Sequence, residues 1–219
     1  MRGIYINGKH TGDDMGMVMT EKDYGTPTAQ TFKVNVPGRN GELDLSEFLT
    51  GEVHYNNREM KFKFLADGNR ENIKTAISKM LLFHGQSAEI ISDDYPDSYY
   101  KGRISIVPHD YGSYAEFEMS VDAEPFRTAR EKSIYSFNTY HKYIWGKECV
   151  IVNNGMPVTA TVTATKGSLE LELLRGSLVP FVSEGNSYKF KLEHGTNIIK
   201  CSGWNTDSIA TFEFTEVFL

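Results

Sequence analysis

Residues 36–64 constrain the fold most, because they join a glycine-rich loop to segments in which apolar and polar side chains alternate. One proline and two glycines within residues 37–41 are typical of a turn. Leu43 and Leu45 then alternate with polar residues, which is the period of a half-buried strand. The stretch carries no pair of catalytic carboxylates, no nucleophile beside a base and no metal-ligand spacing. The stretch therefore predicts a structural element and not a reaction centre.

The second half of this stretch predicts two short strands joined at Asn56-Asn57, since asparagine tolerates the positive φ of a tight hairpin turn. In the strand that follows, apolar side chains point to one face and charged side chains point to the other. The apolar set is Met60, Phe62 and Phe64, and the charged set is Glu59, Lys61 and Lys63.

Period-two runs elsewhere in the first part of the chain predict further strands, the clearest at residues 31–36, 88–91, 99–107 and 114–121. A single helix is predicted after the hairpin, with Asn69 as its N-cap and Gly85 at its C-terminal end. Its stripe at helical spacing contains Ile73, Ile77, Met80, Leu81 and His84, the last as an end-of-helix residue and not a catalytic one.

After a charged segment near residue 130, six short runs at regular spacing predict an antiparallel sandwich of jelly-roll type. These runs are residues 149–152, 158–164, 168–174, 187–192, 196–202 and 209–218. We therefore predict a mainly β protein with a first domain at residues 1–131 and a second at residues 132–219.

The bulk composition excludes several classes of protein. A formal net charge of −6 argues against a basic face that grips nucleic acid. No run of eighteen apolar residues is present, so no membrane insertion is expected, and residues 1–20 lack the apolar core of a secretory signal. The two cysteines, Cys149 and Cys201, are too few for a disulfide framework and are expected to be reduced.

Residues with catalytic or metal-binding chemistry are scattered. The six histidines show no ligand spacing, and the acidic loop with Asp93, Asp94 and Asp97 lacks the ordered pattern of a calcium loop, which favours a solvated turn. Glu170 and Glu172 share one strand face, which favours the wet side of that strand over a glycosidase pair. We expect no catalytic residue, cofactor or metal, and hence no enzyme.

Aromatic side chains leave a binding function open. Tyrosines gather between residues 95 and 114, and Trp145 and Trp204 lie in the second predicted domain. Such rings could stack against sugars, but core or subunit contacts use the same residue types and are favoured here.

The motif Gly38-Arg39-Asn40-Gly41-Glu42-Leu43-Asp44-Leu45-Ser46-Glu47-Phe48-Leu49-Thr50-Gly51 resembles the first domain of siphophage distal tail (Dit) proteins. Two later segments resemble the end of that domain, Tyr100-Lys101-Gly102-Arg103 and Glu124-Pro125-Phe126. The second domain resembles the galectin-like sandwich of that family. The resemblance implies a tail-tube-like β-sandwich or barrel with one helix and a hairpin, followed by the galectin-like domain.

The resemblance also implies a structural virion protein, encoded by a phage or prophage and assembled in the host cytoplasm. Six copies would form a homohexameric ring at the distal end of a non-contractile tail. The ring would join the tail-tube protein to the tail-associated hub protein and the receptor-binding proteins, with a channel through which DNA passes without specific binding.

An edge hairpin with one aromatic face could complete the sheet of a neighbouring copy. We therefore predict that this contact involves Arg39, Glu42, Asp44, Tyr55, Arg58, Met60 and Phe62. The acidic balance predicts a channel lined by carboxylates. The alternative is a carbohydrate-binding accessory module for host cell-wall polysaccharide, and a third interpretation is the tail-tube protein itself.

Overall fold

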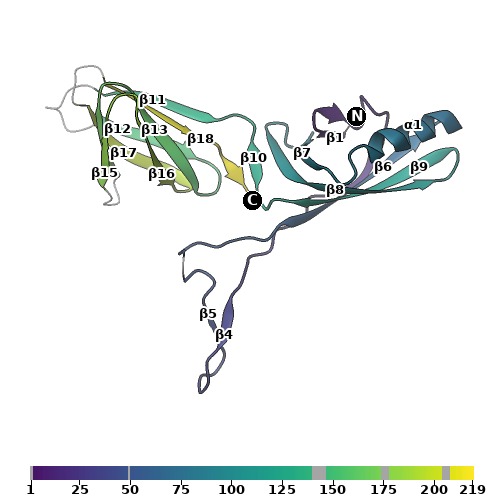
Figure 1. Ribbon diagram of the computed structural model, residues 1–219, viewed down its shortest axis with the longest axis horizontal. Coiled ribbons are helices and arrows are strands. Elements are labelled where there is room, and N and C mark those ends of the chain that lie inside the picture. Colours follow the sequence, from purple (N-terminus) through teal and green to yellow (C-terminus); the bar gives the residue numbers. More distant parts are fainter. Residues whose placement is uncertain (1, 49, 140–146, 174–177, 204–207) are drawn as a thin grey trace. The chain divides into compact units, whose positions relative to one another are not determined.

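The computed structural model describes residues 2–48, 50–139, 147–173, 178–203 and 208–219. The protein is mainly β with one short helix, as the sequence predicted (Figure 1). Contacts between residues divide the chain into two compact units, Met1–Arg127 and Thr128–Leu219. Independent folding of domains bounded at residues 131 and 132 stays a prediction. No helix in the described ranges has the length and apolar character needed to cross a membrane.

The first unit is built on one twisted antiparallel sheet with the strand order β2-β1-β7-β8-β9-β6-β3, which we call the large sheet. The sheet is open, so the barrel that the resemblance allowed is not closed in this chain. Its strands, in chain order, are β1 (Ile4–Ile6), β2 (Lys9–His10), β3 (Val18–Asp23), β6 (Arg58–Asp67), β7 (Ser87–Ser92), β8 (Ser98–Asp110) and β9 (Tyr114–Ala123).

One face of the large sheet is covered by the helix α1 (Arg70–Leu81), which packs against β6, β8 and β9 (Figure 1). Asn69 caps the helix as predicted, because its side-chain oxygen accepts hydrogen bonds from the N–H groups of Glu71 and Asn72. The predicted stripe is partly confirmed, since Ile73 and Met80 are fully buried in the core below, whereas Leu81 is exposed and the helix ends before His84. The helix ends before Gly85, which lies in the following turn.

The predicted alternation in β6 is confirmed. Met60, Phe62 and Phe64 are buried, and they face Val121, Met119 and Phe117 of β9 across the ladder. Each of these pairs removes two large side chains from water, at roughly 25 cal/mol per Å² of apolar surface. The core of the first unit therefore lies between this face of the sheet and α1.

The predicted hairpin exists, but its position was wrong. It is formed by β4 (Lys33–Asn35) and β5 (Glu42–Asp44), which lie side by side in Figure 1. Residues 52–55 form no strand before β6, and Tyr55 makes only an isolated bridge to Ala29. Because β6 lies between β9 and β3, it is an interior strand and not the predicted edge.

The second unit is a sandwich of two four-stranded antiparallel sheets whose inner faces share one core. The first sheet has the order β11 (Ser133–Thr139), β18 (Ser208–Phe214), β13 (Val158–Lys166) and β16 (Ser187–Leu192). The second has the order β12 (Lys147–Asn153), β17 (Gly195–Gly203), β14 (Leu169–Leu173) and β15 (Leu178–Val182). Two short strands, β10 (Arg127–Ala129) and β19 (Val217–Phe218), pair with each other.

The sequence missed two strands of this sandwich, β11 and β15, and merged β18 with β19 into one run. In β11, Tyr135 and Phe137 pack inward while Ile134 is exposed, so apolar residues occupy both faces and obscure the period. β15 has a proline, Pro180, at its centre, and proline is rare inside strands. Its position at the edge of the sheet explains why a strand tolerates it there.

Candidate assembly surface

The segment between β3 and β6 contains a two-stranded antiparallel ribbon, and we call its described residues, 26–48 and 50–57, the arm. Backbone hydrogen bonds run along it from its base, from Asn56 N–H to the Thr28 carbonyl oxygen at 2.8 Å and from Gln30 N–H to the His54 oxygen at 2.7 Å. The ladder continues through β4 and β5, where Val34 lies opposite Leu43. A glycine turn, residues 36–41, closes its tip.

The two faces of the arm differ in chemistry. Directly opposed residues of an antiparallel pair share a face, so Val34 and Leu43 lie on one side with Phe32 and Leu45. On the other side Lys33 lies opposite Asp44. The Ser46 hydroxyl and N–H, and then the charge of Lys33, lower the pKa of Asp44, which is therefore ionised at neutral pH. The arm is thus an amphipathic ribbon.

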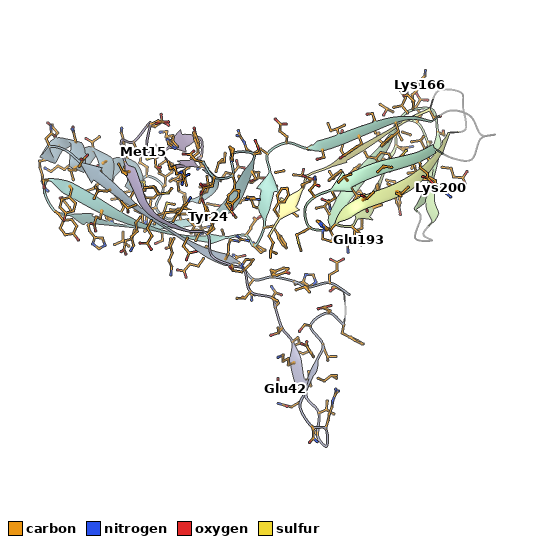
Figure 2. All side chains as sticks on the ribbon, turned by 180° about the vertical axis from the view of Figure 1, so that it is seen from behind. Met15, Tyr24, Glu42, Lys166, Glu193 and Lys200 are labelled. Atoms are coloured by element: carbon orange, nitrogen blue, oxygen red, sulfur yellow. The ribbon has the colours of Figure 1, made fainter. Side chains whose placement is uncertain are left out.

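The arm has no core of its own. Among the described residues from Thr28 to Asn57 none is buried, and Phe32 and Phe48 expose 62% and 78% of their surface. Figure 2 shows the side chains of this ribbon, with Glu42 labelled on β5. An isolated two-stranded ribbon in water is marginally stable at best, and exposed apolar surface of this kind marks an interaction site.

The base of the arm is fixed to the large sheet by polar contacts. Arg58 is buried, and its Nε and Nη2 donate to the Pro125 carbonyl oxygen at 3.0 and 2.5 Å. Its guanidinium lies 5.2 Å from the centre of the Tyr100 ring. Beside it, the Asn57 amide donates to Asp122 Oδ1 at 2.9 Å. Burial lowers the pKa of Arg58, but the group stays charged at neutral pH because the ordinary pKa of arginine is far above 7.

Two further contacts fix the direction in which the chain leaves and re-enters the sheet. The Tyr55 ring meets the Phe126 ring edge to face, with the centroids 5.6 Å apart. Gly25 has a φ of +60°, and a Cβ atom there would lie 2.2 Å from the Glu59 carbonyl oxygen. Only glycine therefore fits where β3 gives way to the arm.

The predicted contact residues fall into two groups. Arg39, Glu42 and Asp44 are exposed on the arm, and Tyr55 is half-buried at its base. Arg58, Met60 and Phe62 are buried within the first unit. These three side chains do not reach the surface, so they would affect a contact with a second copy only indirectly, by holding β6 in place. The sequence analysis missed Phe32, Val34 and Phe48 as contact candidates, although the alternation of residues 31–36 was visible.

The face of the large sheet away from α1 is rich in charge, and we call it the outer face. Glu59 and Asp122 lie opposite each other across β6 and β9, and Lys63 lies opposite Glu118. Lys63 forms an ion pair with Glu21 at 2.8 Å. Carboxylates outnumber fixed cations on this face: Glu21, Asp23, Glu59, Asp67, Glu89, Glu116, Glu118 and Asp122 against Lys61, Lys63, Lys101 and Arg103.

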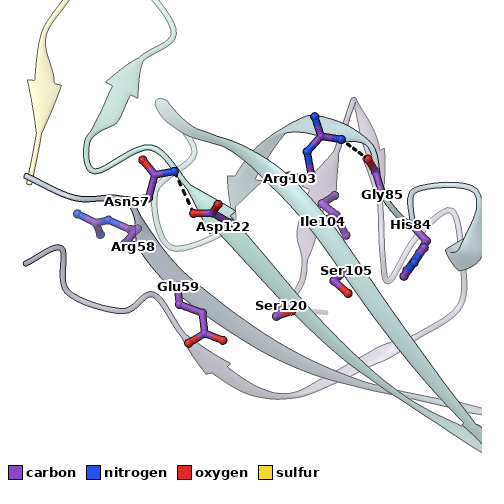
Figure 3. Close-up of a pocket in the computed structure, with 10 residues that line it drawn as sticks. All are labelled: Asn57, Arg58, Glu59, His84, Gly85, Arg103, Ile104, Ser105, Ser120 and Asp122. Carbon is purple, nitrogen blue, oxygen red and sulfur yellow. Dashed lines mark hydrogen bonds between the residues drawn. The ribbon is translucent and has the colours of Figure 1, made fainter.

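A concave site of about 550 Å³ lies on the outer face near the base of the arm (Figure 3). Several of its polar groups already have partners in the chain. Arg103 donates to the Gly85 carbonyl oxygen at 2.5 Å, and His84 Nδ1 accepts the Ile106 N–H at 3.0 Å. Glu59 is paired with Lys61 at 3.3 Å. Ser105 and Ser120 also line the site beside His84.

The acidic loop is bound into the first unit by its carboxylates. Asp94 accepts hydrogen bonds from Lys22 and from the Tyr24 hydroxyl, and these lower its pKa below the ordinary value. Asp93 accepts the Gly3 N–H at 2.8 Å and lies 3.3 Å from His10 Nε2. Within the described residues, no three His, Cys, Asp or Glu side chains are grouped to hold a metal ion.

The second unit presents a different surface. On the outer side of β13, Thr159, Thr161 and Thr163 alternate with the buried Ala160 and Val162. Tyr135 and Phe137 pack against the core. Trp145 and Trp204, which the sequence analysis considered as a sugar platform, lie outside the described residues. The carbohydrate-binding alternative therefore stays a prediction.

Comparison with known structures identifies the fold. The chain superposes over its full length on all of the SPP1 Dit protein (gp 19.1), with a TM-score of 0.69 at 15% sequence identity. That crystal structure is described as a paradigm of the hub adsorption apparatus in phages that infect Gram-positive bacteria. The predicted resemblance to the distal tail family is thus confirmed for the fold.

Two structures of the phage P2 baseplate in its activated conformation also match, one with Ca and one with Sr. Both have a TM-score of 0.41 and cover 97% of this chain and 98% of theirs, with sequence identities of 8% and 7%. A similarity at this level is too weak to support an inference. No family model matches the sequence. No curated protein matches it either.

Proposed function

We propose that this protein is a structural subunit of a phage tail tip, in which six copies form a ring at the distal end of a non-contractile tail. Its full-length likeness in fold to the SPP1 Dit protein supports this role. The ring would join the tail-tube protein on one side to the tail-associated hub protein and the receptor-binding proteins on the other. It would be located in the virion after assembly in the host cytoplasm.

The observation that carries the proposal is the arm without a core. A monomer that exposes Phe32 and Phe48 on a two-stranded ribbon leaves apolar area in water that a neighbouring subunit could cover. A contact in which the arm of each copy reaches the next copy is head-to-tail. Such a contact generates a closed ring when its rotation closes.

The polar face of the arm would set the register of this contact. Asp44 is ionised and lies opposite Lys33, and Glu42 lies opposite Asn35, so this face is hydrated in the free chain. Charged groups of this kind contribute more to specificity and association rate than to affinity. In our proposal Arg39, Glu42 and Asp44 therefore align the arm, and its apolar face supplies most of the binding free energy.

The outer face of the large sheet is our candidate for the wall of the DNA channel. Its excess of carboxylates would repel the DNA phosphates, so the DNA would pass without being held. The support for this assignment is that carboxylates outnumber fixed cations on this one face.

The test is the mass and appearance of the purified full-length protein. We expect a ring in negative-stain images and a mass of six chains in light scattering, alone or after addition of the tail-tube protein. A variant in which Gln30 is joined to His54 by an Asn-Gly turn removes residues 31–53 but keeps the base pairing of the arm. It should fold and stay monomeric, and normal rings formed by it would contradict the proposal.

A further inference from the structure

Two buried thiols face each other inside the second unit. Cys149 on β12 and Cys201 on β17 have their sulfur atoms 3.1 Å apart, and at most 1% of either residue is exposed. In the ladder Cys149 lies opposite Ile199, and Cys201 lies opposite Lys147. The cysteines are therefore diagonal neighbours on the inner face of one sheet. Neither cysteine is in a disulfide bond.

The surroundings of the pair favour one chemistry. Ile151, Leu171 and Ile199 are buried in the same core, and no described histidine or carboxylate joins the cysteines in a metal-binding group. A disulfide bond is about 2.05 Å long, so the sulfur atoms need to approach each other by only about 1 Å. Rotation of the two short side chains is the smallest change that achieves this.

We propose that Cys149 and Cys201 are a latent disulfide site, which closes when the protein meets a small-molecule disulfide oxidant and then fastens β12 to β17. The site does not depend on the proposed role in a phage tail. It concerns the second unit alone, whereas the arm belongs to the first.

The reaction is a pair of thiol–disulfide exchanges. Cys149 Sγ loses its proton to water and attacks one sulfur of the oxidant, whose other sulfur leaves as a thiolate. Cys201 Sγ, deprotonated in turn, attacks Cys149 Sγ in the mixed disulfide and expels the second half of the oxidant as a thiolate. The two protein thiols are oxidised by two electrons, and the oxidant is reduced to two thiols.

Access to the thiols should limit the rate. The hydrogen bond with Cys149, followed by burial, raises the pKa of the Cys201 thiol, so the reactive thiolate is scarce while the core is closed. β12 is an edge strand of its sheet and pairs only with β17 along the sheet order. Local opening of such an edge exposes a core without global unfolding. We expect Cys149, on the opening strand, to react first.

Closing the bond should stabilise the second unit. The bond would link residues 52 positions apart, so it would remove a large part of the loop entropy of the unfolded chain. A rise in Tm of roughly 10–30 °C is expected for this unit from a loop and a domain of this size. A reductant should reverse the rise.

The experiment uses the full-length reduced protein incubated with oxidised glutathione. Thiols are counted after denaturation, the Tm is measured, and the cross-linked peptides are identified by mass spectrometry. We expect both thiols to disappear together, a monomer two hydrogen atoms lighter, and one peptide pair that joins Cys149 to Cys201. A stable glutathione adduct or a cross-link between two chains would overturn the proposal. So would thiols that persist under conditions that oxidise the denatured chain.

Cys149→Ala and Cys201→Ala are the matched controls. Each keeps one thiol in the same core, so neither should gain stability from the oxidant. The decisive readout is the peptide pair from the unmodified sequence, which does not require either variant to fold.

Discussion

Val34 lies directly opposite Leu43 at the centre of the arm, yet both side chains are only partly buried. A cross-strand apolar pair normally belongs to a face that a core covers. In the described part of this chain the pair lies on a ribbon in which no residue from Thr28 to Asn57 is buried. The arm is thus a part of the first unit in which an apolar cross-strand pair lacks a covering core.

Val34→Asp should separate assembly from folding. A carboxylate on the apolar face would have to be desolvated in a subunit contact, so the dissociation constant of the ring should rise about tenfold or more. The unfolding free energy of the monomer should change by less than about 0.5 kcal/mol, because the residue is not buried there. Sedimentation and urea denaturation measure the two quantities.

Asn35→Asp is the matched control for Val34→Asp, since it places the same carboxylate one residue away on the polar face of the arm. Rings that weaken equally with both variants would show that charge, and not the apolar face, controls assembly.

Arg58→Ala should destabilise the first unit without touching the exposed arm. The change removes two hydrogen bonds to the Pro125 carbonyl oxygen and leaves that acceptor unpaired beside the Tyr100 ring. A loss of about 2–3 kcal/mol is expected in the unfolding free energy from urea titration. Arg39→Ala, at the exposed tip of the arm, serves as the control and should be nearly neutral.

Gly25→Ala and Gly38→Ala differ only in the space around the new methyl group. Both glycines have positive φ, +60° and +82°, so both substitutions carry backbone strain of about 1 kcal/mol. At Gly38 no atom lies within 4 Å of the added Cβ, whereas at Gly25 the Glu59 carbonyl oxygen is 2.2 Å away. Thermal unfolding should therefore show a larger loss for Gly25→Ala, and equal losses would contradict the tight entry to the arm.

Asp94→Asn should have an effect that depends on pH. The Lys22 ammonium and the Tyr24 hydroxyl lower the pKa of Asp94 in the folded protein below its ordinary 3.8. The stabilising contribution is therefore present above about pH 4 and is lost as the pH falls through the lowered value. The variant should be less stable than the parent at pH 7 by a modest amount, because the pair is partly exposed.

The difference between Asp94→Asn and the parent should disappear near pH 2, where the carboxylate of the parent is protonated. Denaturant titrations at the two pH values measure it. A stability difference that is the same at both would mean that geometry, and not ionisation, gives Asp94 its role.

Local sequence signals predicted the elements whose partners are close in the chain or whose pattern is unambiguous. Asn69 marked the start of α1, and alternation in β6 identified Met60, Phe62 and Phe64 as core. The resemblance of residues 38–51 to distal tail proteins led to the correct fold. Asn56-Asn57 was misleading, since neither residue has positive φ and the chain passes through it into β6 without turning back.

The sequence by itself determined which side of a clearly alternating strand such as β6 is apolar, because side chains alternate along any extended backbone. Only the tertiary structure decided which strands are neighbours in a sheet. It placed β6 between β3 and β9 and left Val34 and Leu43 without a covering core, although both segments show the same alternation. The physical reason is that the alternation of apolar and polar residues shows only that a strand has an apolar face. The surface that covers this face comes from distant segments or from another molecule.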